Sequence, residues 1–156
     1  MPRWLRIGLI VAVVLFVAIQ LVPKRVSDHA VKAEPPWDSP VTRRLAVAAC
    51  FNCHSNSSHV AWFERVAPLS WWIANHVDEG RDSLIFSEYD PNHHRSGQKV
   101  AHEVEEGTMS PAYYTWFGQH GEAKLSQADR DALIKGLTAT LGPAVGVREG
   151  RGRGGD

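Results

Sequence analysis

The stretch Cys50-Phe51-Asn52-Cys53-His54 decides how this chain can fold. Two cysteines three positions apart, followed directly by a histidine, form the attachment pattern of c-type haem. On a helix, Cys50, Cys53 and His54 stand at i, i+3 and i+4 and project from one face. The two thiols can then form thioethers with one porphyrin while the imidazole ligates its iron. The motif therefore predicts one covalently attached haem c, held by Cys50, Cys53 and His54.

A Cys-x-x-Cys pair also has other uses, and three alternatives stay open at this point. The pair could be a thiol/disulfide redox couple, half of a zinc site, or two buried cysteines. A zinc site needs more ligands, and no second cysteine pair exists, although scattered histidines could contribute. A thioredoxin-like couple needs a βαβ neighbourhood, which the pattern does not indicate. Haem attachment is the favoured interpretation.

A second axial ligand for the iron is suggested by Met109, the one methionine after the initiator. It lies in Gly107-Thr108-Met109-Ser110-Pro111, between a glycine that ends a predicted helix and a proline that stiffens the backbone. A thioether ligand favours ferrous iron and raises the reduction potential relative to a second histidine. We therefore predict that His54 and Met109 are the metal ligands.

Three alternatives to this ligation remain. Met109 could fill a gap in the core, as methionines often do. A histidine such as His76 or His102, both on predicted helices, could take the distal position, or the sixth position could be open. Among the basic residues, Arg81 is the one we predict to bind a haem propionate, because its fork suits a carboxylate, with a solvated surface role as the alternative.

The remaining pattern is helical, and the predicted fold class is all-α: a small cytochrome c-like helical domain around the covalent haem. The last predicted helix is the clearest, since Ser126 resembles an N-cap and Leu133, Ile134 and Leu137 form one apolar stripe. Earlier helices are expected from Thr42 into the haem motif, from Pro68 to Gly80, over 96–106, and in a short segment after Pro111.

The N-terminal stretch 1–25 is predicted as an uncleaved signal anchor, a single transmembrane helix. Arg3 and Arg6 precede an uncharged run over 7–22, which is nearly long enough to cross a bilayer. No clear small-residue cleavage site closes the run. Because c-type haem is attached outside the bacterial cytoplasm, the expected location is the cytoplasmic membrane, with the haem domain facing the periplasm.

The rest of the chain divides into three predicted parts. Residues 26–38 are expected to form a spacer, 39–141 the haem-binding domain, and 142–156 a disordered Gly/Arg-rich tail. The whole chain has 17 basic and 17 acidic residues, and four of the basic ones lie in 1–25. The remainder is mildly acidic, which gives no support to nucleic-acid binding.

Beyond these local patterns, the chain resembles the small bacterial haem-binding domain proteins, membrane-anchored relatives of c-type cytochromes. The resemblance covers nearly all of the domain and implies haem binding through the Cys-x-x-Cys-His segment. Ile85 stands where the family usually has asparagine, and Ser110 interrupts what is often Met-Pro-Pro. The matching motifs are Cys50–Asn56, Ala67–Trp72, Glu79-Gly80-Arg81 leading to Phe86-Ser87-Glu88-Tyr89, and Gly107–Pro111.

Together these features predict a membrane-tethered monohaem c-type cytochrome that transfers single electrons on the outer face of the cytoplasmic membrane. It is expected to be an electron carrier and not an enzyme, with redox partner proteins that the sequence does not name. The alternative is a haem enzyme or a redox or gas sensor with an open sixth iron position. That peroxidase-like alternative needs a distal acid/base group, which His76 or His102 could provide.

Overall fold

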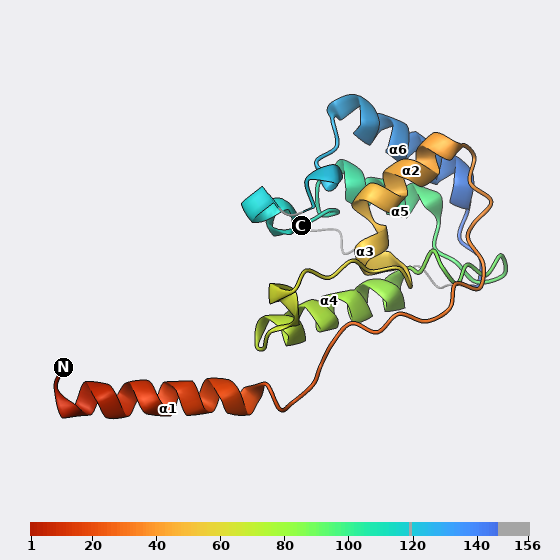
Figure 1. The fold of residues 1–156 in the computed structure, drawn as a ribbon. Coiled ribbons are helices and arrows are strands. Elements are labelled where there is room, and N and C mark those ends of the chain that lie inside the picture. Colours follow the sequence, from red (N-terminus) through yellow and green to blue (C-terminus); the bar gives the residue numbers. More distant parts are fainter. Residues whose placement is uncertain (119, 147–156) are drawn as a thin grey trace, which may run out of the picture.

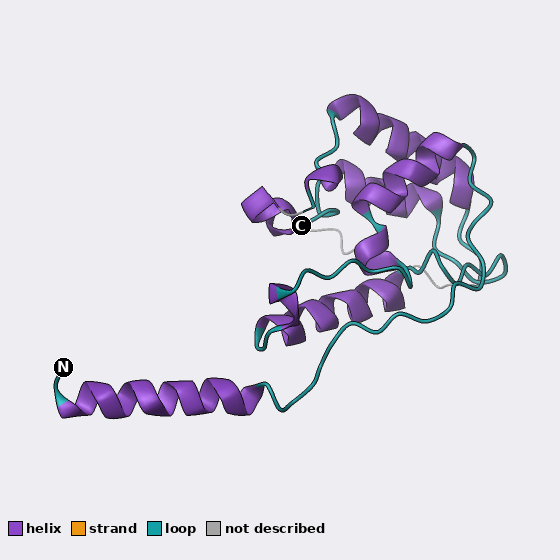
Figure 2. Ribbon diagram, in the orientation of Figure 1, coloured by secondary structure: helices purple, strands orange, loops and turns teal. Residues whose placement is uncertain are grey.

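The computed structural model describes residues 1–118 and 120–146, and this part of the chain forms helices and loops without a strand (Figures 1 and 2). The predicted all-α class is thereby confirmed. The elements are α1 (Arg3–Ile19), α2 (Pro40–Ala49), α3 (Phe51–His54), η1 (Phe63–Arg65), α4 (Leu69–Ser83), α5 (Gly97–Glu105), η2 (Ala112–Gly118), η3 (Gly121–Ala123) and α6 (Gln127–Leu141), where η denotes a 3-10 helix.

The core lies where α2, α5 and α6 pack together, and α3 connects this group to α4 (Figure 1). Helix α6 begins as predicted, because the Ser126 hydroxyl accepts a hydrogen bond from the Asp129 N–H at 3.1 Å. Leu133 and Leu137 of this helix are fully buried. Their apolar side chains are the main contribution of α6 to the stability of the fold.

Helix α6 lies close to α2 at Gly136, where the side chain of Thr42 packs against the glycine. A Cβ atom added at Gly136 would lie only 2.0 Å from Oγ1 of Thr42, so no larger residue fits there without displacing α2. Helix α2 continues almost directly into α3, since Cys50 is the C-cap of the first and the N-cap of the second. The packing of α2 on α6 therefore fixes the position of the haem motif.

The N-terminal helix α1 is shorter than the predicted membrane span. It has 17 residues, or about 25 Å at 1.5 Å per residue, against about 30 Å for a hydrocarbon core. Arg3 and Arg6 lie in its first turn. The helix ends before Gln20, whose side chain pairs with the backbone of Ala67. Its Nε2 donates to the Ala67 carbonyl at 3.1 Å, and its Oε1 accepts from the Ala67 N–H at 2.9 Å.

Within the described ranges, no helix combines the length and apolarity that crossing a membrane requires. The predicted transmembrane helix at 1–25 is therefore wrong, and so is the single-pass, periplasm-facing location in the cytoplasmic membrane. The sequence pattern misled because the uncharged run over 7–22 does not continue as one helix. It leaves the helical conformation after Ile19, before the run ends.

Segment 26–38, predicted as a spacer, lies along the domain in the structure. The Lys32 N–H donates to the Ser87 carbonyl at 2.9 Å, and the Tyr89 N–H donates to the Ala33 carbonyl at 3.0 Å. At the end of the segment, the Trp37 ring packs on Phe86 with centroids 5.3 Å apart. The segment therefore contributes backbone pairing and one aromatic side chain to the folded unit.

An ion pair between this segment and α2 gives the fold a pH dependence. Arg43 donates two 2.7 Å hydrogen bonds to the Glu34 carboxylate and lowers its pKa. Because the pKa of Glu34 is lower in the folded state than in the unfolded chain, the ion pair stabilises the fold at pH values above the ordinary pKa of about 4.3. This stabilisation is lost as the pH falls through the lowered folded-state pKa. We expect Glu34→Gln to cost about 0.5 to 1 kcal/mol at pH 7, since solvent screens the pair.

Urea unfolding of the wild type and the Glu34→Gln variant at pH 7 and pH 3 measures this contribution. The difference in free energy of unfolding is expected to shrink at pH 3. A difference of equal size at both pH values would show that the charge of Glu34 contributes nothing.

The predicted disordered tail over 142–156 lies mostly outside the described residues, which end at 146. The part that is described is attached to the domain. The His94 N–H donates to the Val145 carbonyl at 2.8 Å, and the Val145 N–H donates to the His94 carbonyl at 3.0 Å. The Gly97 N–H at the start of α5 also donates to the Gly142 carbonyl at 2.7 Å.

Candidate functional site

Helix α3 presents the three residues of the haem motif from one turn, as the spacing predicts. The His54 N–H donates to the Cys50 carbonyl at 2.9 Å, and the Cys53 N–H donates to the same carbonyl at 3.1 Å. Cys50, Cys53 and His54 all line one crevice of about 190 Å³, and both cysteines are free thiols. The structure thus brings two thiols and an imidazole to a single apolar opening.

The His54 ring is oriented by the backbone. Its Nδ1 lies 3.0 Å from the carbonyl oxygen of Leu84, the residue that follows α4, so Nδ1 carries the proton and donates it. This leaves Nε2 as the free ligating atom, the arrangement common to metal-bound histidines. Only 9% of the residue is exposed, and burial lowers the pKa of His54, although backbone hydrogen bonds to Leu84 and Gly80 act in the opposite direction. His54 is therefore a neutral imidazole, the form that binds iron.

The two cysteines are protonated thiols. Burial raises the pKa of Cys50 to about 12. Burial also raises the pKa of Cys53, although the nearby Arg81 partly offsets it. A thiol/disulfide couple relies on a thiolate with a lowered pKa, which neither cysteine has. Among the described residues, no group of three or more His, Cys, Asp or Glu side chains is placed to hold a metal ion, as a zinc site would need.

Met109 lines the same crevice as His54, on a loop that is hydrogen-bonded to both α5 and α2. Its N–H donates to the Glu103 carbonyl on α5 at 3.0 Å. The neighbouring Ser110 hydroxyl donates to the Ala49 carbonyl, just before Cys50, at 2.7 Å. Met109 is 39% exposed and is thus not a core-filling methionine. Ser110, which departs from the family pattern, therefore keeps the Met109 loop next to the haem motif.

The other histidines are placed away from this crevice. His54 is the only histidine that lines it in the described ranges. The His102 side chain is 60% exposed and faces Glu105 and Glu106 on the surface of α5. His76 lines a neighbouring cavity and not this one. Of the residues proposed as distal ligands from the sequence, Met109 alone lies at the crevice.

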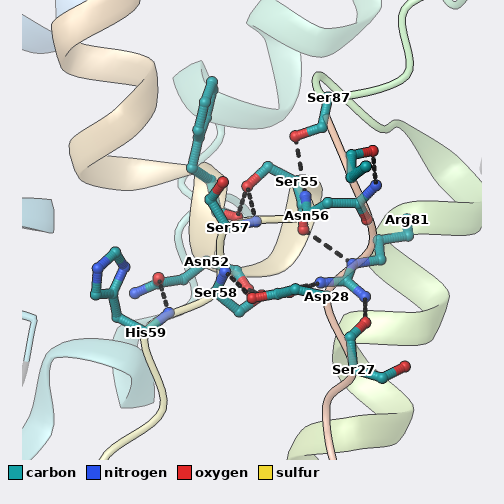
Figure 3. A network of polar contacts seen from close by, with 12 residues as sticks. Ser27, Asp28, Asn52, Ser55, Asn56, Ser57, Ser58, His59, Arg81 and Ser87 are labelled. Carbon is teal, nitrogen blue, oxygen red and sulfur yellow. Dashed lines mark hydrogen bonds and ion pairs between the residues drawn. The ribbon is translucent and has the colours of Figure 1, made fainter. Parts of the chain in front are cut away.

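Arg81, the predicted propionate partner, does not line the crevice. Figure 3 shows its guanidinium between segment 26–38 and the loop that follows His54. It donates to the Ser55 carbonyl at 2.9 Å, to the Ser27 carbonyl at 2.7 Å and to the Asp28 carboxylate at 2.5 Å. Its donors are thus used within the protein, and propionate binding by Arg81 stays a prediction.

Sequence reasoning missed several residues of the crevice, of which Arg95, Glu103 and Tyr114 carry polar groups. Arg95 lines it and donates to the Ser83 hydroxyl at 2.7 Å, so it is the basic side chain placed to meet an acidic group there. Glu103 and Tyr114 also line it. Arg95 lies in a polar loop where no periodic pattern marks it, and only the fold brings it to the site.

The Arg81 network predicts a large effect on stability. The Arg81 side chain is only 12% exposed, and its ion pair with Asp28 joins two segments that are far apart in the sequence. Removing one partner of such a pair leaves buried polar groups unsatisfied. We expect Arg81→Ala to lower the free energy of unfolding by about 2 to 4 kcal/mol, measured by urea unfolding.

Arg44→Ala is the matched control, because Arg44 is exposed on α2 and is expected to change stability by less than about 0.5 kcal/mol. Equal effects of the two substitutions would contradict a special role of the Arg81 network.

An all-helical domain with two thiols, an imidazole and a thioether around one crevice is the arrangement of a haem protein. The model of the haem-binding domain family matches residues 14–139, most of the chain, and the chain belongs to this family. The resemblance found in the sequence is thereby confirmed, and so is haem as the cofactor. No curated protein and no solved structure matches the chain.

Proposed function

We propose that this haem protein is a monohaem c-type cytochrome that transfers single electrons. The observation that carries the proposal is the donor set of the crevice: two free thiols, the oriented Nε2 of His54 and the thioether of Met109. These donors fit haem, because cysteines attach the porphyrin and a histidine with a methionine ligates iron in electron-carrying cytochromes. When bound, haem supplies an iron that gains and loses one electron reversibly.

The chain's own residues would hold the cofactor and limit its motion. Cys50 and Cys53 would anchor it covalently, and the Leu84 carbonyl would keep His54 in one orientation. Four apolar side chains of the crevice would pack against the porphyrin and limit its contact with water: Leu84, Phe86, Val100 and Val104. A fixed histidine and limited contact with water keep the movement of side chains and solvent small when the iron gains or loses an electron.

The alternative is a haem enzyme or sensor with an open sixth position. It requires a distal acid/base group, and the two histidines considered for it, His76 and His102, do not line the crevice. Met109 does, which favours electron transfer. The proposed partners are redox proteins, and the mildly acidic composition outside 1–25 favours a partner with a basic docking patch.

The test is the visible spectrum of protein matured in a host that attaches c-type haem, recorded oxidised and reduced. We expect one haem per chain and a low-spin spectrum in both states. A high-spin spectrum would overturn electron transfer in favour of the open sixth position. Absence of haem would overturn the proposal and leave the thiol interpretation.

A further inference from the structure

A second and larger cavity adjoins the haem crevice. It has a volume of about 550 Å³ and lies among α3, η1, α4 and η2. Small-molecule sites usually measure about 300 to 1,000 Å³, so this cavity has the size of a binding site of its own. Of the residues proposed to hold the haem, Cys53 lines this cavity, whereas Cys50, His54 and Met109 line the crevice and not this cavity.

The walls of this cavity are mostly aromatic. Trp72 of α4 packs against Tyr113 of η2 with ring centroids 4.9 Å apart, and its ring centroid lies 4.3 Å from that of His76. Phe63 and Trp116 also line the cavity. Trp72 is 43% exposed and Trp116 59% exposed, so these rings are not part of the core. Such walls favour a flat, apolar ligand that stacks on them.

The polar groups of the cavity include three imidazoles and one carboxylate. His59, His76 and His120 line it, and Nε2 of His120 lies 3.8 Å from the carboxylate of Glu64. The side chains of His120 and Glu64 are only 12% and 15% exposed. No lysine or arginine is among the described residues that line the cavity, so a phosphate or carboxylate ligand would find no cationic partner.

His120 itself is held in an unusual conformation. Its φ of 48° is left-handed, the only such value at a non-glycine residue in the described ranges. Its ring stacks on Tyr114 with centroids 4.2 Å apart, and Nδ1 lies 3.1 Å from the side-chain amide of Asn52. Strained backbone of this kind is concentrated at functional sites. The stack and the amide contact fix an imidazole at the edge of the cavity.

The two cavities share a wall. Asn52, Cys53, Pro111 and Tyr114 line both. Asn52 is an internal residue of the haem motif, and its side-chain amide donates to the Tyr114 hydroxyl. A ligand in the second cavity would therefore lie next to the residues that attach the haem.

We propose that the second cavity binds a neutral hydroxylated aromatic ring, of the phenol or hydroquinone class. The aromatic walls take the ring, and the imidazoles accept the hydrogen bond of its hydroxyl group. A hydroquinone that gives one electron to ferric haem and one proton to water becomes a semiquinone, and a second such transfer gives the quinone. The site would therefore receive an electron donor for the haem, and this last part rests on the proposed function.

The experiment is calorimetric titration of the haem-loaded protein with 2-naphthol, naphthalene and 2-naphthoate. We expect saturable binding of 2-naphthol, about tenfold or more tighter than naphthalene, which lacks the hydroxyl group. We expect 2-naphthoate to bind more weakly still, because its charge has no partner. Equal binding of all three compounds, or no binding, would overturn the site.

Two variants locate the binding. His76→Phe keeps an aromatic ring but removes the hydrogen-bonding atoms, and Trp72→Ala removes a wall. Both are expected to weaken 2-naphthol binding about tenfold while the haem spectrum stays unchanged, whereas His102→Ala on the exposed face of α5 serves as the control. A changed haem spectrum would show that this cavity holds part of the porphyrin, which overturns the inference and leaves the proposed function intact.

Discussion

Haem is expected to separate completely from the Cys50→Ser, Cys53→Ser double variant on denaturation, whereas it stays with the wild-type chain. Serine hydroxyls fill the same space as the thiols but form no thioethers with haem. In the variant only coordination by His54 and Met109 would hold the cofactor, and coordination is lost when the fold is lost. The measurement is haem staining of the chain after electrophoresis in denaturant.

The single variants refine this result. Cys50→Ser and Cys53→Ser each keep one thiol, so each is expected to retain haem through one bond. Ser57→Ala is the matched control, because Ser57 is exposed three residues beyond His54. Haem that stays with the denatured double variant would contradict attachment through these cysteines. Loss of haem from the wild type would mean that the cofactor is bound without covalent attachment.

The parts of the structure that could be predicted from sequence are those encoded within one or two helical turns. The spacing of Cys50, Cys53 and His54 places them on one turn, and the Ser126 cap starts α6 where the pattern indicates. A methionine between glycine and proline also indicated a constrained loop. These signals depend on neighbours a few residues away, and such contacts survive in any fold that keeps the local helix.

The parts that could not be predicted depend on contacts between distant segments. The role of the Leu84 carbonyl at His54 joins residues 30 positions apart, and the Arg81 contact with Asp28 joins residues 53 apart. Nothing in the local pattern around Arg81 distinguishes a side chain that pairs with protein from one that pairs with a propionate. The end of α1 was missed for a similar reason, since Gln20 turns away to meet Ala67.

The second large effect is expected at Met109. In the haem-loaded protein, Met109→Ala should convert low-spin ferric haem to a high-spin form and remove the weak far-red band of methionine-ligated iron. Alanine offers no ligand for iron. Among the described residues, His54 is the only histidine that lines the crevice, so no second histidine is placed to replace Met109. Because the iron–thioether bond forms only in the folded state, its loss is also expected to lower the free energy of unfolding of the haem-loaded protein. Visible spectra and thermal unfolding of the same samples measure both.

Met109→His separates ligation from packing. Histidine at this position can restore a six-coordinate, low-spin iron without the far-red band, and two histidine ligands lower the reduction potential relative to histidine with methionine. Thr108→Ala controls for disturbance of the loop, because Thr108 is fastened to Glu103 but offers no ligand. If Met109→Ala leaves the spectrum unchanged, Met109 does not hold the iron. The haem would then have an open position or another ligand, and catalysis or sensing would replace electron transfer as the function that the site supports.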